Sequence, residues 1–258
     1  DPLPIQEHNT FAHRSAHDGV MHACGHDGHT AMLMAAAHHI ATEVDFSGTL
    51  NLIFQPAEEH PGGAKLMIEQ GLFDQFPCDA VFALHNMPGI PAGHLTFIDG
   101  AAMASSDDVT IVLRGTGGHG AMPHRAQDPV VAAASIVMAL QTIVSRNVSP
   151  TDSAVITVGS IVAGQANNVI PESARLTLSV RALDREVRRS LQQRITDLVD
   201  AQAKSFNVTA DIDYRLDYPV LVNSRSETEW ARQIAIDLVG EARVTRSGTP
   251  LTGSEDFA

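Results

Sequence analysis

Residues 21–29 read Met-His-Ala-Cys-Gly-His-Asp-Gly-His, and a segment rich in alanine and methionine, 30–44, follows directly. The composition of that segment predicts a buried helix that begins at a glycine-rich turn. The turn carries one thiol and three imidazoles, which are ligand groups for zinc and related metals. This stretch therefore predicts a helix with a metal site at its start.

Cys24 and His26 are the first candidate ligands of this site. A single buried cysteine is usually a small apolar core residue, and a single histidine is usually structural. The pair of them, placed between Gly25 and Gly28 at the start of a helix, favours metal ligation. For His22 and His29, structural or supporting roles weigh as much as ligation.

The next stretch outward is Gln-Pro-Ala-Glu-Glu at 55–59, directly after the apolar run 49–54, which predicts a buried strand. Adjacent carboxylates in loops are commonly solvated surface charge. Two of them at a strand end raise each other's proton affinity unless a cation is near. We therefore expect one of Glu58 and Glu59 to bind the metal and the other to handle water as a general base.

A second apolar run, 80–84, precedes His85. The alternation of strands with the helices 30–44 and 63–70 predicts an α/β, doubly wound parallel sheet, whose sites form beyond the carboxyl ends of the strands. Taken alone, His85 could equally be structural. Its place beyond the same sheet as Glu58 makes it a third candidate ligand.

The pattern changes near Ser105 and becomes β-α-β-β-α-β, which is the split βαβ, ferredoxin-like order of an α+β domain. The expected elements are a strand through 109–113, a helix 129–146, strands 154–162 and 174–183, a helix from 185 to about 206, and a strand 208–214. We therefore predict one domain from residues 1–105 and 217–258, with residues 106–216 inserted in it. A helix over 226–239 returns to the first domain.

Residues 115–120, Gly-Thr-Gly-Gly-His-Gly, match the dinucleotide-binding pattern G-x-G-x-x-G. No helix opens at the third glycine, so the amide groups that would hold a pyrophosphate are missing. The glycines instead predict a tight loop that presents His119. A solvent-exposed loop histidine is the simpler alternative. Arg181 is either an exposed strand residue or a clamp for a substrate carboxylate, and the sequence favours neither.

The composition limits the remaining functions. The chain has 258 residues and a formal net charge of −13, which argues against binding nucleic acid. No apolar run reaches the length of a membrane span, so we expect no membrane association. Two cysteines indicate no disulfide framework and a reducing compartment, the cytoplasm.

Six motifs together resemble the M20 metallopeptidase family, in the amidohydrolase branch that includes hippurate hydrolases, aminoacylase-like enzymes and indole-acetyl-amino-acid hydrolases. They are MHACGHDGHTAML (21–33), IFQPAEE (53–59), LHNMP (84–88), GGHGAMPH (117–124), NNVIP (167–171) and GSEDFA (253–258). The resemblance implies a zinc-peptidase-like catalytic domain with two metal ions and an inserted lid domain through which two copies dimerise. It implies metal-dependent hydrolysis of N-acyl amino acids.

The resemblance also assigns roles to residues. It implies that Cys24 bridges two metals, that His26, Glu59 and His85 are terminal ligands, and that Glu58 is the general base. The other expected site residues are His119 for catalysis from the lid, Asn168 and Arg181 for binding the substrate, and Asp1 as a supporting residue near the ligands. The thiolate and imidazole ligands favour zinc, while manganese, cobalt or nickel also suit the carboxylates.

The family pattern includes a further ligand, a histidine downstream of residue 258, and a strand and helix before Asp1. For residues 1–258 alone we therefore expect four of five ligands and weak activity. Two other functions stay open, which are a dipeptidase or carboxypeptidase of the same fold and a non-catalytic binding fragment. The presence of Glu58 argues against the second.

Overall fold

The computed structural model describes residues 2–59 and 62–258. The chain divides into two compact units, the first formed by residues 1–94 with 257 and the second by residues 95–256 with 258. Residues 217–256 therefore group with the inserted segment, whereas the sequence assigns them to the same domain as residues 1–105. The predicted domain boundaries stay a prediction.

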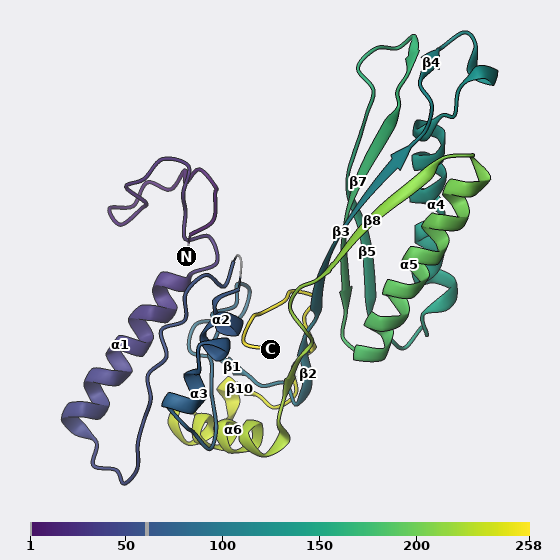
Figure 1. Cartoon of the computed structure of the whole chain (residues 1–258). Helices are drawn as coiled ribbons and strands as arrows, with labels where there is room; N and C mark the ends of the chain where they lie inside the picture. Colours follow the sequence, from purple (N-terminus) through teal and green to yellow (C-terminus); the bar gives the residue numbers. More distant parts are fainter. Residues whose placement is uncertain (1, 60–61) are drawn as a thin grey trace. The chain divides into compact units, whose positions relative to one another are not determined.

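The second unit is built on a four-stranded antiparallel sheet with the strand order β5-β7-β3-β8 (Figure 1). Its strands and the two long helices that connect them are β3 (Ser105–Arg114), α4 (Pro129–Asn147), β5 (Ala154–Ala163), β7 (Ser173–Ala182), α5 (Arg185–Ser205) and β8 (Thr209–Leu216). This is the β-α-β-β-α-β order that the sequence predicts. We call residues 105–216 the sheet–helix region.

Local sequence accounts for where the two long helices begin. Asp128 precedes Pro129 at the first position of α4, and its carboxylate accepts hydrogen bonds from the amides of Val130 and Val131. Asp184 accepts two equivalent amide hydrogen bonds at the start of α5. Both caps satisfy amide groups that otherwise lack a partner in the first turn.

The core lies where α4 and α5 pack side by side against the sheet (Figure 1). Every second residue of β3 from Val109 to Leu113 faces this core, so Val109, Ile111 and Leu113 are fully buried. Within the described part of the chain, α4 is the one helix long and apolar enough to cross a membrane by length and composition. Five of its buried residues belong to the core, whereas Val130, Val131 and Met138 are exposed.

Shorter elements complete the second unit. They are β1 (Leu95–Thr96), β2 (Gly100–Met103), β4 (Gly118–His119), β6 (Val169–Ile170), β9 (Leu221–Asn223), α6 (Arg225–Val239) and β10 (Val244–Thr245), with 3-10 turns at Pro123–Arg125 and Glu241–Arg243. β1 pairs with β10 in parallel, and β2 and β4 pair antiparallel with β9 and β6. These pairs bring segments that are distant in sequence together within this unit.

The first unit contains three helices and loops, which are α1 (His26–Glu43), α2 (Gly63–Glu69) and α3 (Leu72–Gln75). Helices are present over both predicted ranges, 30–44 and 63–70, but the expectation that the first of them is buried is wrong, because no residue of α1 is buried. The strands predicted over 49–54 and 80–84 are wrong for the described residues, because neither segment has a strand partner there. A strand needs a neighbour to accept and donate its backbone hydrogen bonds, which an apolar run alone does not supply.

Candidate metal centre and carboxylate-binding arginine

A thiol and two imidazoles meet within the first unit. The Sγ atom of Cys24 lies 3.5 Å from Nε2 of His85, although 61 positions separate the two residues. One ligand atom from each of Cys24, His26 and His85 lies within 4.8 Å of the others. Gly25 permits this approach for two reasons. Its φ is 82°, which residues other than glycine rarely adopt, and a Cβ there would lie 2.5 Å from the side-chain amide nitrogen of Asn86.

The two carboxylates approach the same imidazole from a second loop. Nε2 of His26 lies 3.7 Å from a carboxylate oxygen of Glu58, and both side chains are half-buried. His26, Glu58 and Glu59 form a second group with ligand atoms within 4.8 Å of one another. Ala57 directly before them has a φ of 57°, a left-handed conformation that few residues other than glycine adopt. The turn therefore sets the direction of both carboxylates.

These distances fit a metal site. Ligand atoms at 2.0–2.3 Å from one zinc ion can be no farther than about 4.6 Å from one another. The ligand atoms of each group lie within 4.8 Å of one another, and the two groups share His26. The donors are one thiol, two imidazoles and two carboxylates, which is a set that divalent transition metals prefer.

Hydrogen bonds around Asn86 orient His85 for such a role. Nδ1 of His85 donates to the carbonyl of Asn86, so in the neutral imidazole the lone pair of Nε2 faces Cys24. The amide of Asn86 in turn donates to Nε2 of His29 at 3.0 Å. Burial lowers the pKa of His29, a hydrogen bond between its ring and the side-chain oxygen of Asn86 opposes that shift, and the neighbouring imidazoles add to it. His29 thus supports the loop that carries His85.

His119 and Asn168 lie together in the second unit. β4 pairs with β6, and the amide of Gly120 donates to the carbonyl of Asn168 at 2.8 Å. The amide of Ala121 donates to Nδ1 of His119, so a neutral imidazole there carries its proton on Nε2. His119 is exposed and can therefore donate a hydrogen bond to a ligand.

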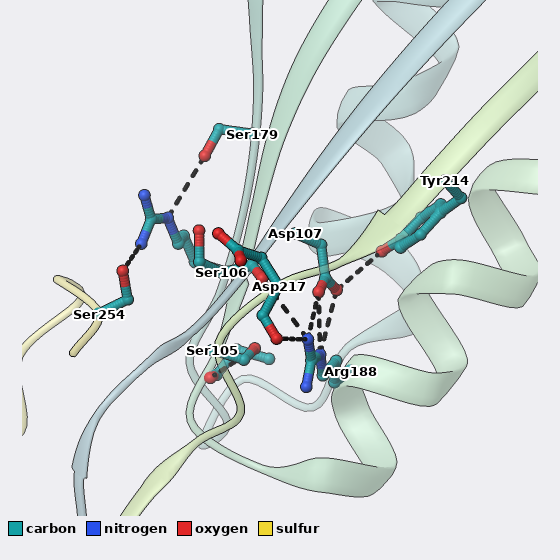
Figure 2. Close-up of polar contacts among 10 residues, drawn as sticks. Ser105, Ser106, Asp107, Ser179, Arg188, Tyr214, Asp217 and Ser254 are labelled. Carbon is teal, nitrogen blue, oxygen red and sulfur yellow. Dashed lines mark hydrogen bonds and ion pairs between the residues drawn. The ribbon is translucent and has the colours of Figure 1, made fainter. Parts of the chain in front are cut away.

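Arg181 lies near the far end of β7. Its Nη1 donates to Oγ of Ser254 at 2.7 Å, and its Nε donates to Oγ of Ser179 at 3.3 Å (Figure 2). Asn168 precedes β7, whose start at Ser173 is about 25 Å from Arg181 at the usual rise per residue. The structure therefore separates Arg181 from His119 and Asn168 within one chain. Asp1, the remaining predicted site residue, lies outside the described residues.

A buried polar cluster at the base of the sheet–helix region was missed by sequence reasoning. Asp107 is fully buried and accepts hydrogen bonds from Arg188 and from the hydroxyl of Tyr214 (Figure 2). Arg188 also donates to the backbone carbonyl of Asp217, where the chain leaves β8. The alternation that turns Val109 inward turns Asp107 inward too, and this signal could have revealed the cluster.

Residues 1–258 match a family model described as peptidase family M20/M25/M40. The chain therefore belongs to this family, and its fold is the mixed α/β fold of M20 peptidases. The predicted membership and the predicted class of enzyme, a hydrolase, are confirmed.

Individual relatives show which members of the family this chain is similar to. The chain is 45% identical over 257 residues to hippurate hydrolase of Campylobacter jejuni, with all of this chain and 67% of that protein covered. It is 40% identical to N-acetyl-L-cysteine deacetylase of Bacillus subtilis, over 61% of the length of that protein. A dinuclear metal-binding M20 peptidase from Bacillus subtilis superposes with a TM-score of 0.81 at 31% identity, covering all of this chain and 66% of the other. The chain thus spans about two thirds of the length of these relatives.

Proposed function

We propose that the protein hydrolyses the amide bond of N-acyl amino acids with the help of two divalent metal ions. The observation that carries the proposal is the convergence of Cys24, His26, Glu58, Glu59 and His85 in two ligand groups that share one imidazole. Relatives named as a hippurate hydrolase and as an acetyl-amino-acid deacetylase favour acyl amino acids over dipeptides as substrates.

In this proposal Cys24, His26, Glu59 and His85 hold the metals. Zinc suits the thiolate and the imidazoles best, while manganese, cobalt and nickel remain compatible with the carboxylates. Divalent ions, when bound, polarise a substrate carbonyl and lower the pKa of water. The resemblance assigns the bridging position to Cys24, whereas the two ligand groups share His26. We retain Cys24 as a residue that would hold the metals, and its ligation is tested below.

Glu58 acts as the general base. It takes a proton from water as the water oxygen attacks the amide carbonyl carbon, and it passes that proton to the amine that leaves. The imidazole of His119, which carries its proton on Nε2, donates a hydrogen bond to the carbonyl oxygen as negative charge develops on it. Asn168 and Arg181 bind the carboxylate of the substrate.

The separation of Arg181 from His119 and Asn168 supports a shared site. One small carboxylate cannot reach both ends of β7 in a single chain. We therefore propose that the sheet–helix region acts as a lid that pairs two copies, so that His119 and Asn168 of one copy complete the site of the other. A symmetric pair would use the same surface twice. We also propose that this homodimer is cytoplasmic, since a chain with two cysteines and no disulfide framework suits a reducing compartment.

The central test separates the two carboxylates in the full-length protein. Glu58→Gln should keep the metal content of the wild type and lose about 10²–10⁴ in turnover of hippurate. Glu59→Ala should lose metal as well as turnover. The roles of the two glutamates are tested by metal analysis and by initial rates on a panel of acyl amino acids and dipeptides. Near-normal turnover by Glu58→Gln would contradict the assignment, and faster cleavage of dipeptides would favour a dipeptidase.

A thiol assay tests Cys24. A coordinated thiolate should react slowly with iodoacetamide while metal is bound and quickly after chelation. Cys78 is exposed and serves as the internal control that reacts in both states. Equal rates at Cys24 before and after chelation would show that the thiol does not bind metal.

Subunit mixing tests the shared site. Glu58→Gln and His119→Ala proteins are each expected to be inactive, and mixed dimers should regain one intact site. Recovered activity after demonstrated exchange supports His119 acting on the partner. Absence of recovery despite exchange would contradict it.

A further inference from the structure

Arg181 has two neutral partners in the second unit. The hydroxyls of Ser179 and Ser254 accept hydrogen bonds from Nε and Nη1 of Arg181. No ion pair between Arg181 and a carboxylate is found among the described residues. A guanidinium carries five N–H donors, so three of them remain after these two bonds. The positive charge of Arg181 is therefore oriented by neutral groups and is not neutralised by them.

Arg188, in the same unit, is paired with a carboxylate, unlike Arg181. Its Nε donates to both oxygens of the buried Asp107 carboxylate, at 3.0 and 3.2 Å. That guanidinium is neutralised inside the protein and serves the structure. The contrast indicates that the charge of Arg181 is kept available for an anion from outside.

The contact with Ser254 spans 73 positions of sequence and joins β7 to the segment that follows β10. An arginine side chain has many rotamers, and holding it in one of them reduces the entropy lost when a ligand binds. Ser179 lies on β7 itself, two residues from Arg181, so it holds only the base of the guanidinium. Ser254 holds Nη1, at the end of the guanidinium that commonly binds carboxylates in a bidentate manner.

We propose that Ser254 is a positioning residue for substrate recognition, which holds Arg181 so that its free N–H groups face the carboxylate of the acyl amino acid. The inference rests on the proposed function and names the feature of the substrate, a free carboxylate, that this contact selects. Ser254 does not itself touch the reacting atoms.

The test compares variants of the full-length, metal-loaded protein on two substrates, hippurate and hippuramide, which lacks the carboxylate. Ser254→Ala should raise KM for hippurate about 5- to 10-fold, within the range expected for one lost hydrogen bond of ordinary strength, with kcat changed less than twofold. KM for hippuramide should not change. Ser254→Thr keeps a hydroxyl and should restore most of the loss.

Two further variants serve as controls. Ser160→Ala removes a serine hydroxyl that bonds Thr177 on the same sheet at 2.9 Å, and it should leave both substrates unaffected. Arg181→Ala should raise KM for hippurate more than Ser254→Ala does. If Ser254 acts through Arg181, adding Ser254→Ala to Arg181→Ala should change KM no further.

Unchanged KM for hippurate in Ser254→Ala would overturn this inference alone, provided that the wild type hydrolyses hippurate. Equal increases for hippurate and hippuramide would also overturn it, because they indicate general disruption. Failure of the wild type to hydrolyse any acyl amino acid would overturn the proposed function and this inference with it.

Discussion

The two units hold their important residues in different ways. In the second unit, a cluster of buried aliphatic side chains packs the sheet against α4 and α5. Among the described residues of the first unit, only Gly63 is buried. The candidate ligands there are positioned by glycine turns, backbone hydrogen bonds and one another.

The difference suggests that core packing in the second unit controls the stability of the protein, whereas the turns of the first unit control its metal chemistry. Removing core volume should cost free energy in the second unit, because a cavity created inside a closely packed core is only partly refilled by relaxation. In the first unit, backbone conformation and bound metal should matter more, since metal binding to a folded site stabilises that fold. The following predictions, from the largest expected effect to the smallest, test this comparison.

Asp107→Ala should have the largest effect on stability. It leaves the cation of Arg188 without its buried partner, which should cost about 3–5 kcal/mol of unfolding free energy. Asp211→Ala is the control, because its ion pair with Arg114 is exposed and should be worth less than about 1 kcal/mol. Urea denaturation measures both, and equal losses would break the distinction between buried and surface pairs.

Leu140→Ala should cost about 2–5 kcal/mol, because Leu140 is fully buried in the core and its removal leaves a cavity. Met138 lies two residues away on α4 and is 72% exposed, so Met138→Ala should change stability by less than about 0.5 kcal/mol. A larger loss of stability in Met138→Ala would indicate that another surface covers this exposed face of α4.

Gly25→Ala tests the first unit. The left-handed φ of Gly25 should cost alanine about 1–2 kcal/mol, and the added Cβ would collide with the Asn86 amide. Because Asn86 holds His85, we expect metal affinity to fall about 10-fold as well. Gly28→Ala is the matched control in α1, where a Cβ meets nothing and helix propensity favours alanine. Equal metal affinity in both variants would contradict the role of this turn.

Tyr214→Phe should have the smallest effect at neutral pH, about 1 kcal/mol for one lost hydrogen bond. Burial, followed by the Asp107 carboxylate, raises the pKa of Tyr214 above its ordinary value. The folded state therefore keeps a proton that the unfolded state releases above pH 10. This contribution to stability is complete below pH 10 and is lost as pH rises, by up to about 1.4 kcal/mol per unit.

Unfolding measured between pH 9 and 11 checks this slope. The wild type should lose stability more steeply than Tyr214→Phe over that range, and parallel curves would contradict the assignment.

The order of helices and strands that we predict for residues 106–216 matches the structure closely. The inward positions of β3 and the caps at Asp128 and Asp184 follow from neighbours within a few residues, so local sequence suffices for them. The runs 49–54 and 80–84 were predicted as strands and are not, because pairing depends on segments elsewhere in the chain. A strand requires both an apolar run and a neighbouring strand to pair with, and local sequence reveals only the first.

The sequence by itself determined the chemistry that this protein can offer, since the thiol, imidazoles and carboxylates are fixed by residue type and their motifs identify the family. Only the tertiary structure decided which of them meet. It brings Cys24 to His85 across 61 positions and Ser254 to Arg181 across 73, and it places Asp107 beside Arg188. The reason is that such contacts depend on how distant segments pack, and no local pattern of residues encodes that distance.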